Sequence, residues 1–309
     1  MNGSLPKVTI NIPTYNQERY IARAIESALK QDYTNLEIIV SDDCSTDNTY
    51  NIARKFESER VKVYRSFHNT GRVANYRNML YSLSTGDWVV NLDGDDYYID
   101  NKFISEAIHL IQQHKGVVMY AAGAKVYLES KNKFVSGKIH TSQDIKLMKG
   151  TEYVMRLKEL GQVVQHFAVL YNRQEALQTN FYSLDSLGCD TDSLCRLALK
   201  GNVIVHKKYV GVWTSHGANA SYTLNIHTVE KELKMFRSIA DTAKAYLPEE
   251  VVEKWYKERE REKIRESLIE SYATLPVKEA VTLFKKNFKP NFINFKELVK
   301  LSLRILHLR

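Results

Sequence analysis

The first hundred residues of this 309-residue chain predict an α/β protein with a mostly parallel sheet flanked by helices. Short β-branched runs alternate there with segments of helical periodicity, which is typical of strands joined by crossover helices. Polar and acidic residues directly follow the apolar runs, where the ligand-binding residues of an open parallel sheet lie. An apolar content of 44% is sufficient for a substantial core.

Four strands and an amphipathic helix are expected in this region. The strands are residues 7–12, 36–40, 61–64 and 87–92. Residues 17–30 place apolar side chains at helical spacing, which predicts a helix with one buried face. Those side chains are Ile21, Ala24, Ile25, Ala28 and Leu29.

The run DGDD, residues 93–96, follows the apolar strand sequence WVVNL. Carboxylates two residues apart at a strand end can share a Mg²⁺ or Mn²⁺ ion that keeps several waters and also binds substrate phosphates. Asp93, Asp95 and Asp96 therefore predict a diphosphate site. The alternative is a polar turn, because Asp-Gly is a favoured turn dipeptide.

Two further motifs follow the first two strands: PTYN at residues 13–16 and SDDCSTD at residues 41–47. An aromatic ring can stack on a nucleobase, and a carboxylate can accept hydrogen bonds from a pyrimidine N–H or from ribose hydroxyls. Asp47 is instead assigned to capping a helix that starts near Thr46. The residues expected to line a nucleoside pocket are Pro13, Thr14, Tyr15, Asn16 and Asp43.

A helix is also expected to begin within NTGRVANYRN, residues 69–78. Its Arg72 and Arg77 could meet a phosphate of the nucleotide or pair with the carboxylates. Simple solvent exposure is the alternative for each of these two side chains.

These four motifs, in this order over residues 13–96, resemble those of the family-2 glycosyltransferases. The resemblance implies the GT-A fold, with a Rossmann-like, mostly parallel central sheet, and inverting transfer from a nucleotide-sugar donor. It also implies that Asp93, Asp95 and Asp96 match the DxD-type motif, whose carboxylates hold Mn²⁺ or Mg²⁺ and the donor ribose.

The segment GCDTDSLCRLALKG, residues 188–201, looks like the family's acidic motif before a helix. Cys189 replaces the usual first acid, and Asp190 occupies the position of the catalytic base, with Asp192 as its rival. A carboxylate base suits transfer to a hydroxyl, which must lose its proton as it attacks. The alternative is that both aspartates are first-turn residues of a helix over residues 194–199, favoured by its dipole.

The segment VWTSHGANAS, residues 212–221, is similar to a family segment whose His reaches the metal or the diphosphate. His216 is the matching position and a further metal ligand under this interpretation; a structural or surface His is the alternative. The acceptor-binding region, residues 102–185, carries no motif. Five side chains there could contact sugar or simply pack: Tyr120, Tyr127, His140, Gln165 and His166.

Residues 1–224 are expected to form the transferase domain, with a nucleotide-binding half (1–97) and an acceptor half (98–224). A basic helical extension, residues 225–309, completes the chain. Residues 249–270 predict an exposed helix. Residues 271–309 carry eight Lys or Arg against two Glu, interleaved with apolar residues. They predict either a surface for an anionic membrane or a packed helix with a solvated basic face.

The formal charge of +8 comes without a recognisable nucleic-acid-binding module, so nucleic acid is not an expected partner. Three cysteines without CxxC spacing argue against a disulfide framework or a structural zinc site. No signal peptide and no apolar run of membrane-spanning length is visible. The expected location is the cytoplasm, including the cytoplasmic face of the membrane.

Together these features predict a metal-dependent glycosyltransferase that uses a nucleotide-sugar, expected to be a UDP-sugar. The expected acceptor is a saccharide or lipid-linked saccharide in bacterial surface-polysaccharide assembly. A sugar nucleotidyltransferase is one alternative, although such enzymes usually have a Gly-rich first loop and PTYNQERY contains no Gly. A catalytically inactive nucleotide-sugar-binding scaffold is the other, suggested by Cys189 and the basic tail.

Overall fold

The computed structural model describes residues 5–161, 165–219, 226–274 and 279. The chain divides into two compact units. The first comprises Met1–Leu184 with Cys189–Gly217, and the second comprises Asp185–Gly188 with Ala218–Arg309. The boundary expected from the sequence, between a transferase domain of residues 1–224 and a helical extension of residues 225–309, stays a prediction.

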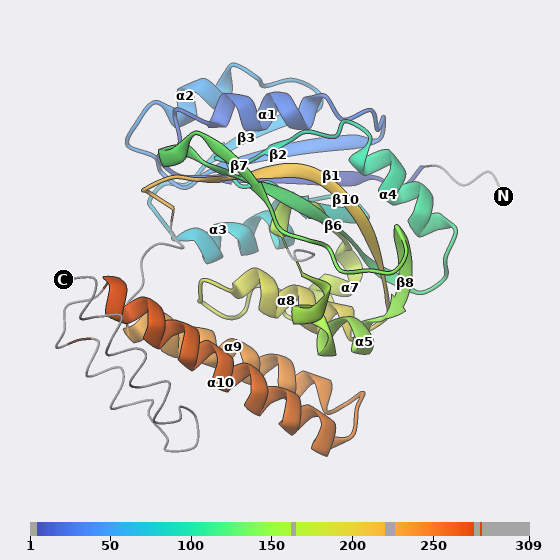
Figure 1. The fold of residues 1–309 in the computed structure, drawn as a ribbon. Helices are drawn as coiled ribbons and strands as arrows, with labels where there is room; N and C mark the ends of the chain where they lie inside the picture. Colours follow the sequence, from blue (N-terminus) through green and yellow to red (C-terminus); the bar gives the residue numbers. More distant parts are fainter. Residues whose placement is uncertain (1–4, 162–164, 220–225, 275–278, 280–309) are drawn as a thin grey trace. The chain divides into compact units, whose positions relative to one another are not determined.

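Within the described residues of the first unit, ten strands form one sheet (Figure 1). The strand order is β3-β2-β1-β4-β9-β6-β10-β5, with β7 beside β6 and β8 beside β10. The strands are β1 (Val8–Thr14), β2 (Leu36–Asp42), β3 (Val61–Arg65), β4 (Trp88–Asn91), β5 (Tyr97–Tyr98), β6 (Val117–Leu128), β7 (Lys133–Ser136), β8 (Ile145–Lys149), β9 (Val169–Asn172) and β10 (Asn202–Ser215).

The strand directions bring the chemically interesting strand ends to one edge of the sheet. Strands β3, β2, β1 and β4 are mutually parallel. Antiparallel β9 separates β4 from β6, so β6 runs in the direction of β4, and β10 is parallel to β6. The expectation of a mostly parallel sheet is confirmed, and the carboxyl ends of β1, β2, β4, β6 and β10 meet at the same edge.

The helices of the first unit lie on both faces of this sheet, with α1, α2 and α4 on one face and α3 and α8 on the other (Figure 1). Their bounds are α1 (Ile21–Leu29), α2 (Thr49–Arg54), α3 (Arg72–Asn78), α4 (Phe103–Gln112), α5 (Gly150–Met155), α6 (Leu157–Leu160), α7 (Arg173–Gln178) and α8 (Cys189–Ala198). Three short helical segments join them: η1 (Met79–Leu83), η2 (Glu129–Lys131) and η3 (His166–Ala168).

All four strands expected from the sequence are present, and α1 buries the apolar face that its spacing predicts. Its start differs from the expected one: α1 begins at Ile21, because residues 17–20 form a turn in which the Gln17 carbonyl accepts hydrogen bonds from the N–H groups of Tyr20 and Ile21. Helix α8 begins at Cys189, five residues before the expected start. Asp190 and Asp192 therefore lie in its first turn, as the structural alternative predicts.

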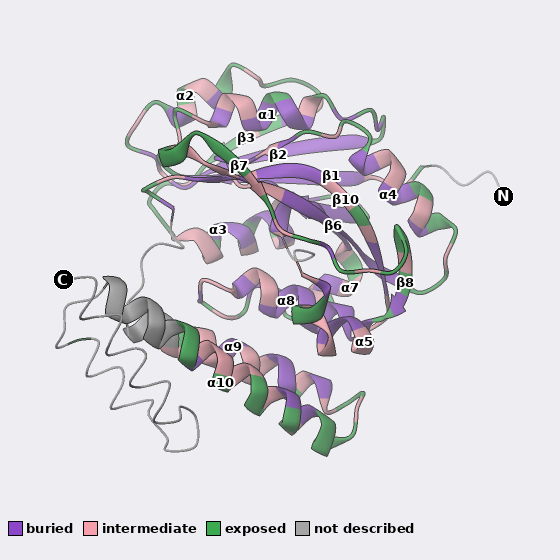
Figure 2. Cartoon of the chain, viewed as in Figure 1, coloured by how far each residue is buried: buried purple, intermediate pink, exposed green. Residues whose placement is uncertain are grey.

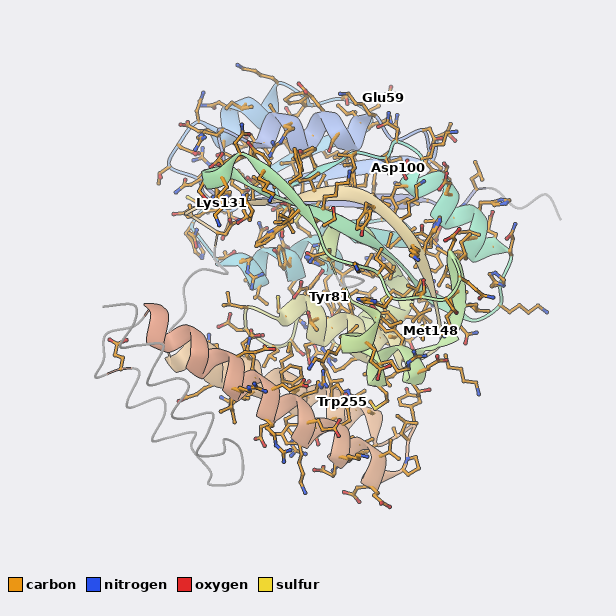
Figure 3. The ribbon with its side chains drawn as sticks, viewed as in Figure 1. Glu59, Tyr81, Asp100, Lys131, Met148 and Trp255 are labelled. Carbon is orange, nitrogen blue, oxygen red and sulfur yellow. The ribbon has the colours of Figure 1, made fainter. Side chains whose placement is uncertain are left out.

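Within its described residues, the second unit contains two helices, α9 (Ile226–Ala243) and α10 (Glu249–Thr274). The expectation that residues 249–270 form an exposed helix is wrong in part. Val252, Trp255 and Ile264 are buried, and the Trp255 ring, labelled in Figure 3, lies 6.2 Å from the ring of Phe236 on α9. The other residues of α10 up to Glu266 are intermediate or exposed (Figure 2). The alternating charges therefore predicted the outer face of this helix correctly but gave no sign of its buried face.

Within the described ranges, none of the helices is both long and apolar enough to cross a membrane. The membrane expectation depends on the basic tail, residues 271–309, and all of this tail except residues 271–274 and 279 lies outside the described residues.

Candidate active site

Five parallel strand ends supply side chains to one edge of the sheet in the first unit. Tyr15 follows β1, Asp43 follows β2, Asp93 follows β4, Glu129 follows β6 and His216 follows β10. Ligands of open α/β sheets bind at such an edge, outside the carboxyl ends of the strands. The topology therefore brings together residues that lie up to 201 positions apart in the sequence.

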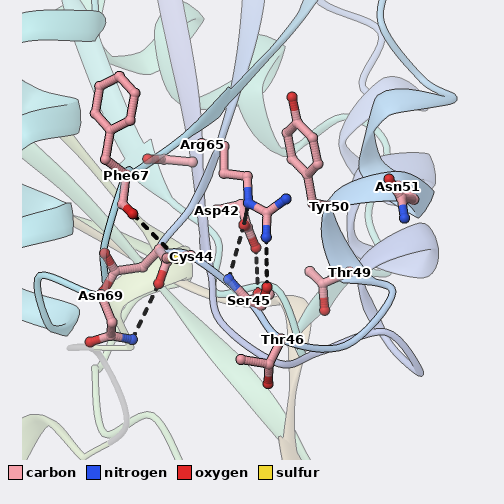
Figure 4. Close-up of polar contacts among 12 residues, drawn as sticks. Asp42, Cys44, Ser45, Thr46, Thr49, Tyr50, Asn51, Arg65, Phe67 and Asn69 are labelled. Atoms are coloured by element: carbon pink, nitrogen blue, oxygen red, sulfur yellow. Dashed lines mark hydrogen bonds and ion pairs between the residues drawn. The ribbon is translucent and has the colours of Figure 1, made fainter.

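The loop after β2 is ordered by Asp42 (Figure 4). The buried Asp42 carboxylate accepts hydrogen bonds from the N–H and the hydroxyl of Ser45, and it pairs with the Arg65 guanidinium at 3.4 Å. Asn16, which has a positive φ of 53°, accepts a hydrogen bond from the N–H of Thr46 at 2.8 Å. This hydrogen bond connects the PTYN motif to the SDDCSTD motif.

Asp43 and Asp47 have different surroundings. Both carboxylate oxygens of Asp43 accept hydrogen bonds from the turn before α3, from Thr70 and from the N–H of Gly71 at 2.8 Å. A nucleoside contact of Asp43 stays a prediction, as does one of Tyr15, whose side chain is exposed. Asp47 accepts a hydrogen bond from the N–H of Thr49, the first residue of α2. The N-cap of α2 is Asn48, whose side chain makes no capping hydrogen bond, so Asp47 contacts the first turn from one residue further back than its capping assignment predicts.

The DGDD loop lies directly against PTYN. A methyl group added at Gly94 would approach the Thr14 hydroxyl to 2.8 Å and would also meet Gln17. Glycine is therefore required for the close approach of the two loops. Asp95 is buried beside His216, with its Oδ2 2.9 Å from the imidazole Nε2.

The other two carboxylates of the loop point to different partners. Asp93 Oδ1 accepts a hydrogen bond of 2.6 Å from the Tyr76 hydroxyl, and Asp96 Oδ1 accepts one of 2.8 Å from the N–H of Thr214. Burial, followed by the negative charge of Asp95, raises the pKa of Asp93 to about 7 and that of Asp96 well above its ordinary value. The raised pKa values show that negative charge on these neighbouring carboxylates is unfavourable in the absence of a cation. A nearby cation would stabilise their ionised forms.

The four predicted metal ligands, Asp93, Asp95, Asp96 and His216, do not converge on one point. No three His, Cys, Asp or Glu side chains within the described ranges form a group able to hold a metal ion. Asp95 and His216 nevertheless fit as a pair: neighbouring ligands of an octahedral ion, with bonds of about 2.1 Å, lie about 3 Å apart. The observed distance of 2.9 Å between Asp95 Oδ2 and His216 Nε2 agrees with this geometry. The other coordination positions of such an ion would be filled by waters and phosphate oxygens.

Asp190, the predicted base, lies on the first turn of α8 near Arg72 and His166. Burial lowers the pKa of Arg72, but electrostatic interactions, including those with Asp190 and Asp93, outweigh it and raise that pKa above its ordinary value. Arg72 is therefore a permanent cation that interacts with both Asp190 and Asp93. Burial raises the pKa of Cys189 to about 12, so this residue is a neutral thiol and carries none of the charge of the acid it replaces.

Asp192, the rival base, has a structural environment. It is fully buried and pairs with Arg196, with Oδ2 2.9 Å from Nη2 and 3.0 Å from Nε. Its rival role stays a prediction, but the ion pair leaves its carboxylate less available to a hydroxyl than that of Asp190.

Arg77 and two of the five candidate sugar contacts, Tyr120 and His166, are committed to structural contacts, while Tyr127, His140 and Gln165 are at least partly exposed. Arg77 donates a hydrogen bond of 2.8 Å to the Phe181 carbonyl, so among the two predicted arginines Arg72 is the one near the carboxylates. Tyr120 is fully buried, and its hydroxyl lies 2.7 Å from Nδ1 of His206. His166 is buried, 2.6 Å from the Tyr182 hydroxyl, and it interacts electrostatically with Asp190.

Sequence reasoning missed four side chains that support the site: Tyr20, Arg23, Tyr76 and Glu129. Tyr76 donates to Asp93, and Arg23 donates to the Asp95 carbonyl at 2.9 Å. Tyr76 and Arg23 lie within segments predicted to be helical, where the same side chains could equally pack or face solvent. Only their three-dimensional contacts distinguish them.

The sheet order and the acidic loop at its carboxyl edge define the GT-A class of α/β proteins. Residues 9–181 match the model of Glycosyl transferase family 2. Because this match covers more than half of the chain, the chain belongs to glycosyl transferase family 2.

Two curated relatives and two solved structures illustrate the similarity. The poly(ribitol-phosphate) beta-N-acetylglucosaminyltransferase TarS of Staphylococcus aureus (strain Mu50 / ATCC 700699) is 35% identical over 116 residues, 37% of this chain and 20% of TarS. The UDP-Glc:alpha-D-GlcNAc-diphosphoundecaprenol beta-1,3-glucosyltransferase WfaP of Escherichia coli is 37% identical over 114 residues, 37% of this chain and 45% of WfaP. These matches thus span less than half the length of each relative.

Among solved structures, S. aureus TarS 1-349 in complex with UDP-GlcNAc superposes with a TM-score of 0.71 at 20% identity, covering 91% of this chain and 80% of that chain. The mannosyltransferase PcManGT from Pyrobaculum calidifontis, in complex with GDP-Man and Mn²⁺, has a TM-score of 0.60 at 14% identity, covering 98% and 86%. At these identities the likeness shows the fold, and the GT-A expectation is confirmed.

Proposed function

We propose that this protein is an inverting glycosyltransferase that moves a sugar from a UDP-sugar to an acceptor hydroxyl. The observation that carries the proposal is the pairing of Asp95 with His216 at the edge where Asp93, Arg72 and Asp190 also gather. A cationic guanidinium that interacts with both Asp93 and Asp190 suits a reaction in which negative charge develops on a leaving diphosphate.

Asp95 and His216 would hold a Mn²⁺ or Mg²⁺ ion, with Asp93 and Asp96 adding negative charge around it. When bound, the ion stabilises the charge that develops on the leaving nucleoside diphosphate, an effect of several kcal/mol. PTYN and Asp43 would contribute the nucleoside pocket, with the exposed Tyr15 ring as its stacking surface.

Asp190 would accept the proton of the acceptor hydroxyl as that hydroxyl attacks the sugar. Arg72 would orient the Asp190 carboxylate and meet the donor phosphates. Inversion of the anomeric centre is proposed from the family, because one base and one attacking hydroxyl make a single displacement.

The UDP donor class is proposed from the relatives. TarS has been solved with UDP-GlcNAc, and the name of WfaP specifies UDP-Glc and a diphosphoundecaprenol acceptor. We propose by analogy an acceptor in bacterial cell-surface glycan assembly, either a lipid-linked saccharide or a polymer. The basic residues of the tail, 271–309, would then bring the protein to the anionic cytoplasmic face of a membrane.

The test is the Asp190→Asn variant, which keeps the side-chain shape and removes the proton acceptor. We expect sugar transfer to fall by about 10²- to 10⁴-fold while the UDP dissociation constant changes less than about threefold. Asp32→Asn, an exposed carboxylate before β2 at the opposite edge of the sheet, is the matched control. Undiminished turnover by Asp190→Asn would contradict its assignment as base. Nucleotide binding without transfer or donor hydrolysis by the wild type would favour the inactive scaffold.

A further inference from the structure

The imidazole of His216 is held between two groups, and only one of them is the proposed metal partner Asp95. On its other side the ring of Tyr20 stacks on it, with a centroid separation of 4.8 Å and an interplanar angle of 15°. The His216 side chain is only 9% exposed. This contact fixes the plane of the imidazole, and with it the direction of Nε2.

Tyr20 is itself fixed by the carboxylate of Glu129. The Tyr20 hydroxyl donates to Oε1 at 3.0 Å and lies 3.1 Å from Oε2. Arg19, the preceding residue, pairs with the same carboxylate at 3.3 Å.

Three segments far apart in sequence therefore meet at this point. Tyr20 is the residue before α1, Glu129 follows β6 and His216 follows β10. The same end of α1 also reaches the second proposed ligand, because Arg23 donates to the Asp95 carbonyl and to the Thr214 hydroxyl, each at 2.9 Å. The start of α1 thus contacts both partners of the Asp95–His216 pair.

Metal-binding imidazoles depend on neighbours that orient the ring, and loss of such a neighbour typically lowers metal affinity about 10- to 100-fold. We propose that Tyr20 and Glu129 are positioning residues, which hold the His216 imidazole against Asp95 and so set the metal affinity of the donor site. We call this pair the Tyr20–Glu129 brace. The proposal rests on the proposed function in one respect only, the metal bound by Asp95 and His216.

The first test concerns the brace itself and needs neither metal nor nucleotide. In the metal-free protein, the imidazole NMR signals of His216, assigned by their loss in His216→Ala, should move downfield in Tyr20→Leu, because a stacked ring shields the protons over its face. Tyr20→Phe should retain most of this shielding. Tyr64→Leu, an exposed tyrosine on β3, is the matched control. His216 signals that stay unchanged in Tyr20→Leu would overturn the proposal.

The second test measures the UDP dissociation constant in Mn²⁺ and in EDTA. Tyr20→Leu should weaken Mn²⁺-dependent binding by about 10-fold and leave the value in EDTA within about twofold. Glu129→Ala should have a smaller effect in the same direction, and Glu129→Gln, which keeps an acceptor, should recover part of the loss.

The double variant Tyr20→Leu with His216→Ala distinguishes positioning from a general loss of packing. If Tyr20 acts through His216, the double variant binds Mn²⁺ and UDP no more weakly than His216→Ala alone. Additive losses, or an equal loss in EDTA, would overturn the brace. A wild type that binds no UDP with Mn²⁺ would contradict the proposed function, while the NMR test would still decide whether Tyr20 orients His216.

Discussion

The buried imidazole of His166 gives the protein a specific sensitivity to acid. Burial lowers the pKa of His166 from 6.5 to about 4. Between these values the unfolded chain binds a proton that the folded chain does not, so the folded state loses stability as the pH falls. We expect the free energy of unfolding to decrease by on the order of 3 kcal/mol between pH 7 and pH 4 from this residue.

Urea unfolding at several pH values measures this effect. His166→Gln can still hydrogen-bond to Tyr182 but cannot take up a proton, so its stability should depend less steeply on pH over the same window. Parallel pH profiles for the wild type and the variant would show that His166 does not contribute to the acid sensitivity.

Single residues also show where sequence reasoning succeeded and where it stopped. The proximity of Asp95 and His216 was anticipated, because both positions match family motifs at strand ends. The Tyr20–Glu129 brace was not anticipated, because 109 residues separate its members and neither belongs to a recognisable motif. Contacts of this kind depend on which strand ends the topology brings together, and periodicity in the sequence carries no information about that.

At the scale of elements, α8 combines a catalytic candidate with a structural anchor. Arg196, four residues after Asp192, donates to the carbonyls of Thr179 and Asn180 and to the Ser183 hydroxyl. The anchored loop contains two non-glycine residues with positive φ, Asn180 and Tyr182. The buried ion pair therefore holds a strained loop near the candidate base.

We expect Asp192→Asn and Arg196→Met to destabilise the protein by about 3 kcal/mol each, since each leaves a buried charge without its partner. Asp190→Asn, half-buried and outside this pair, should cost less than about 1 kcal/mol. Chemical unfolding of the three variants gives these values directly. A smaller loss for Asp192→Asn than for Asp190→Asn would reverse the structural and catalytic roles proposed for the two residues.

Elements were predicted more accurately than their ends. The spacing of apolar residues identified α1 and its buried face, but the turn of residues 17–20 shortened the helix through backbone hydrogen bonds that the spacing does not encode. Likewise β1 and β2 extend into motifs assigned to loops, because Thr14 and Asp42 continue the parallel ladder as paired residues. Hydrogen-bonded neighbours, rather than residue type, set these boundaries.

At the scale of the whole molecule, the basic tail predicts binding to anionic membranes. The wild type should float with liposomes that contain anionic lipid and not with zwitterionic liposomes. Each cation near the surface contributes on the order of 1 kcal/mol, so replacing Lys285, Lys286 and Lys289 by Glu should abolish flotation at low salt. Wild-type protein that stays unbound from anionic liposomes at low salt would contradict the membrane proposal.

The central claim is that the carboxyl edge of the sheet is a metal-dependent site for the nucleotide part of a sugar donor. Calorimetric titration of UDP, dTDP and GDP, each with Mn²⁺ and with EDTA, tests it most directly on the wild type, Asp95→Ala and the control Asp32→Asn. The account predicts Mn²⁺-dependent binding of UDP by the wild type and the control, and its loss in Asp95→Ala. Failure of all three nucleotides to bind the wild type, or equal binding in EDTA, would contradict it.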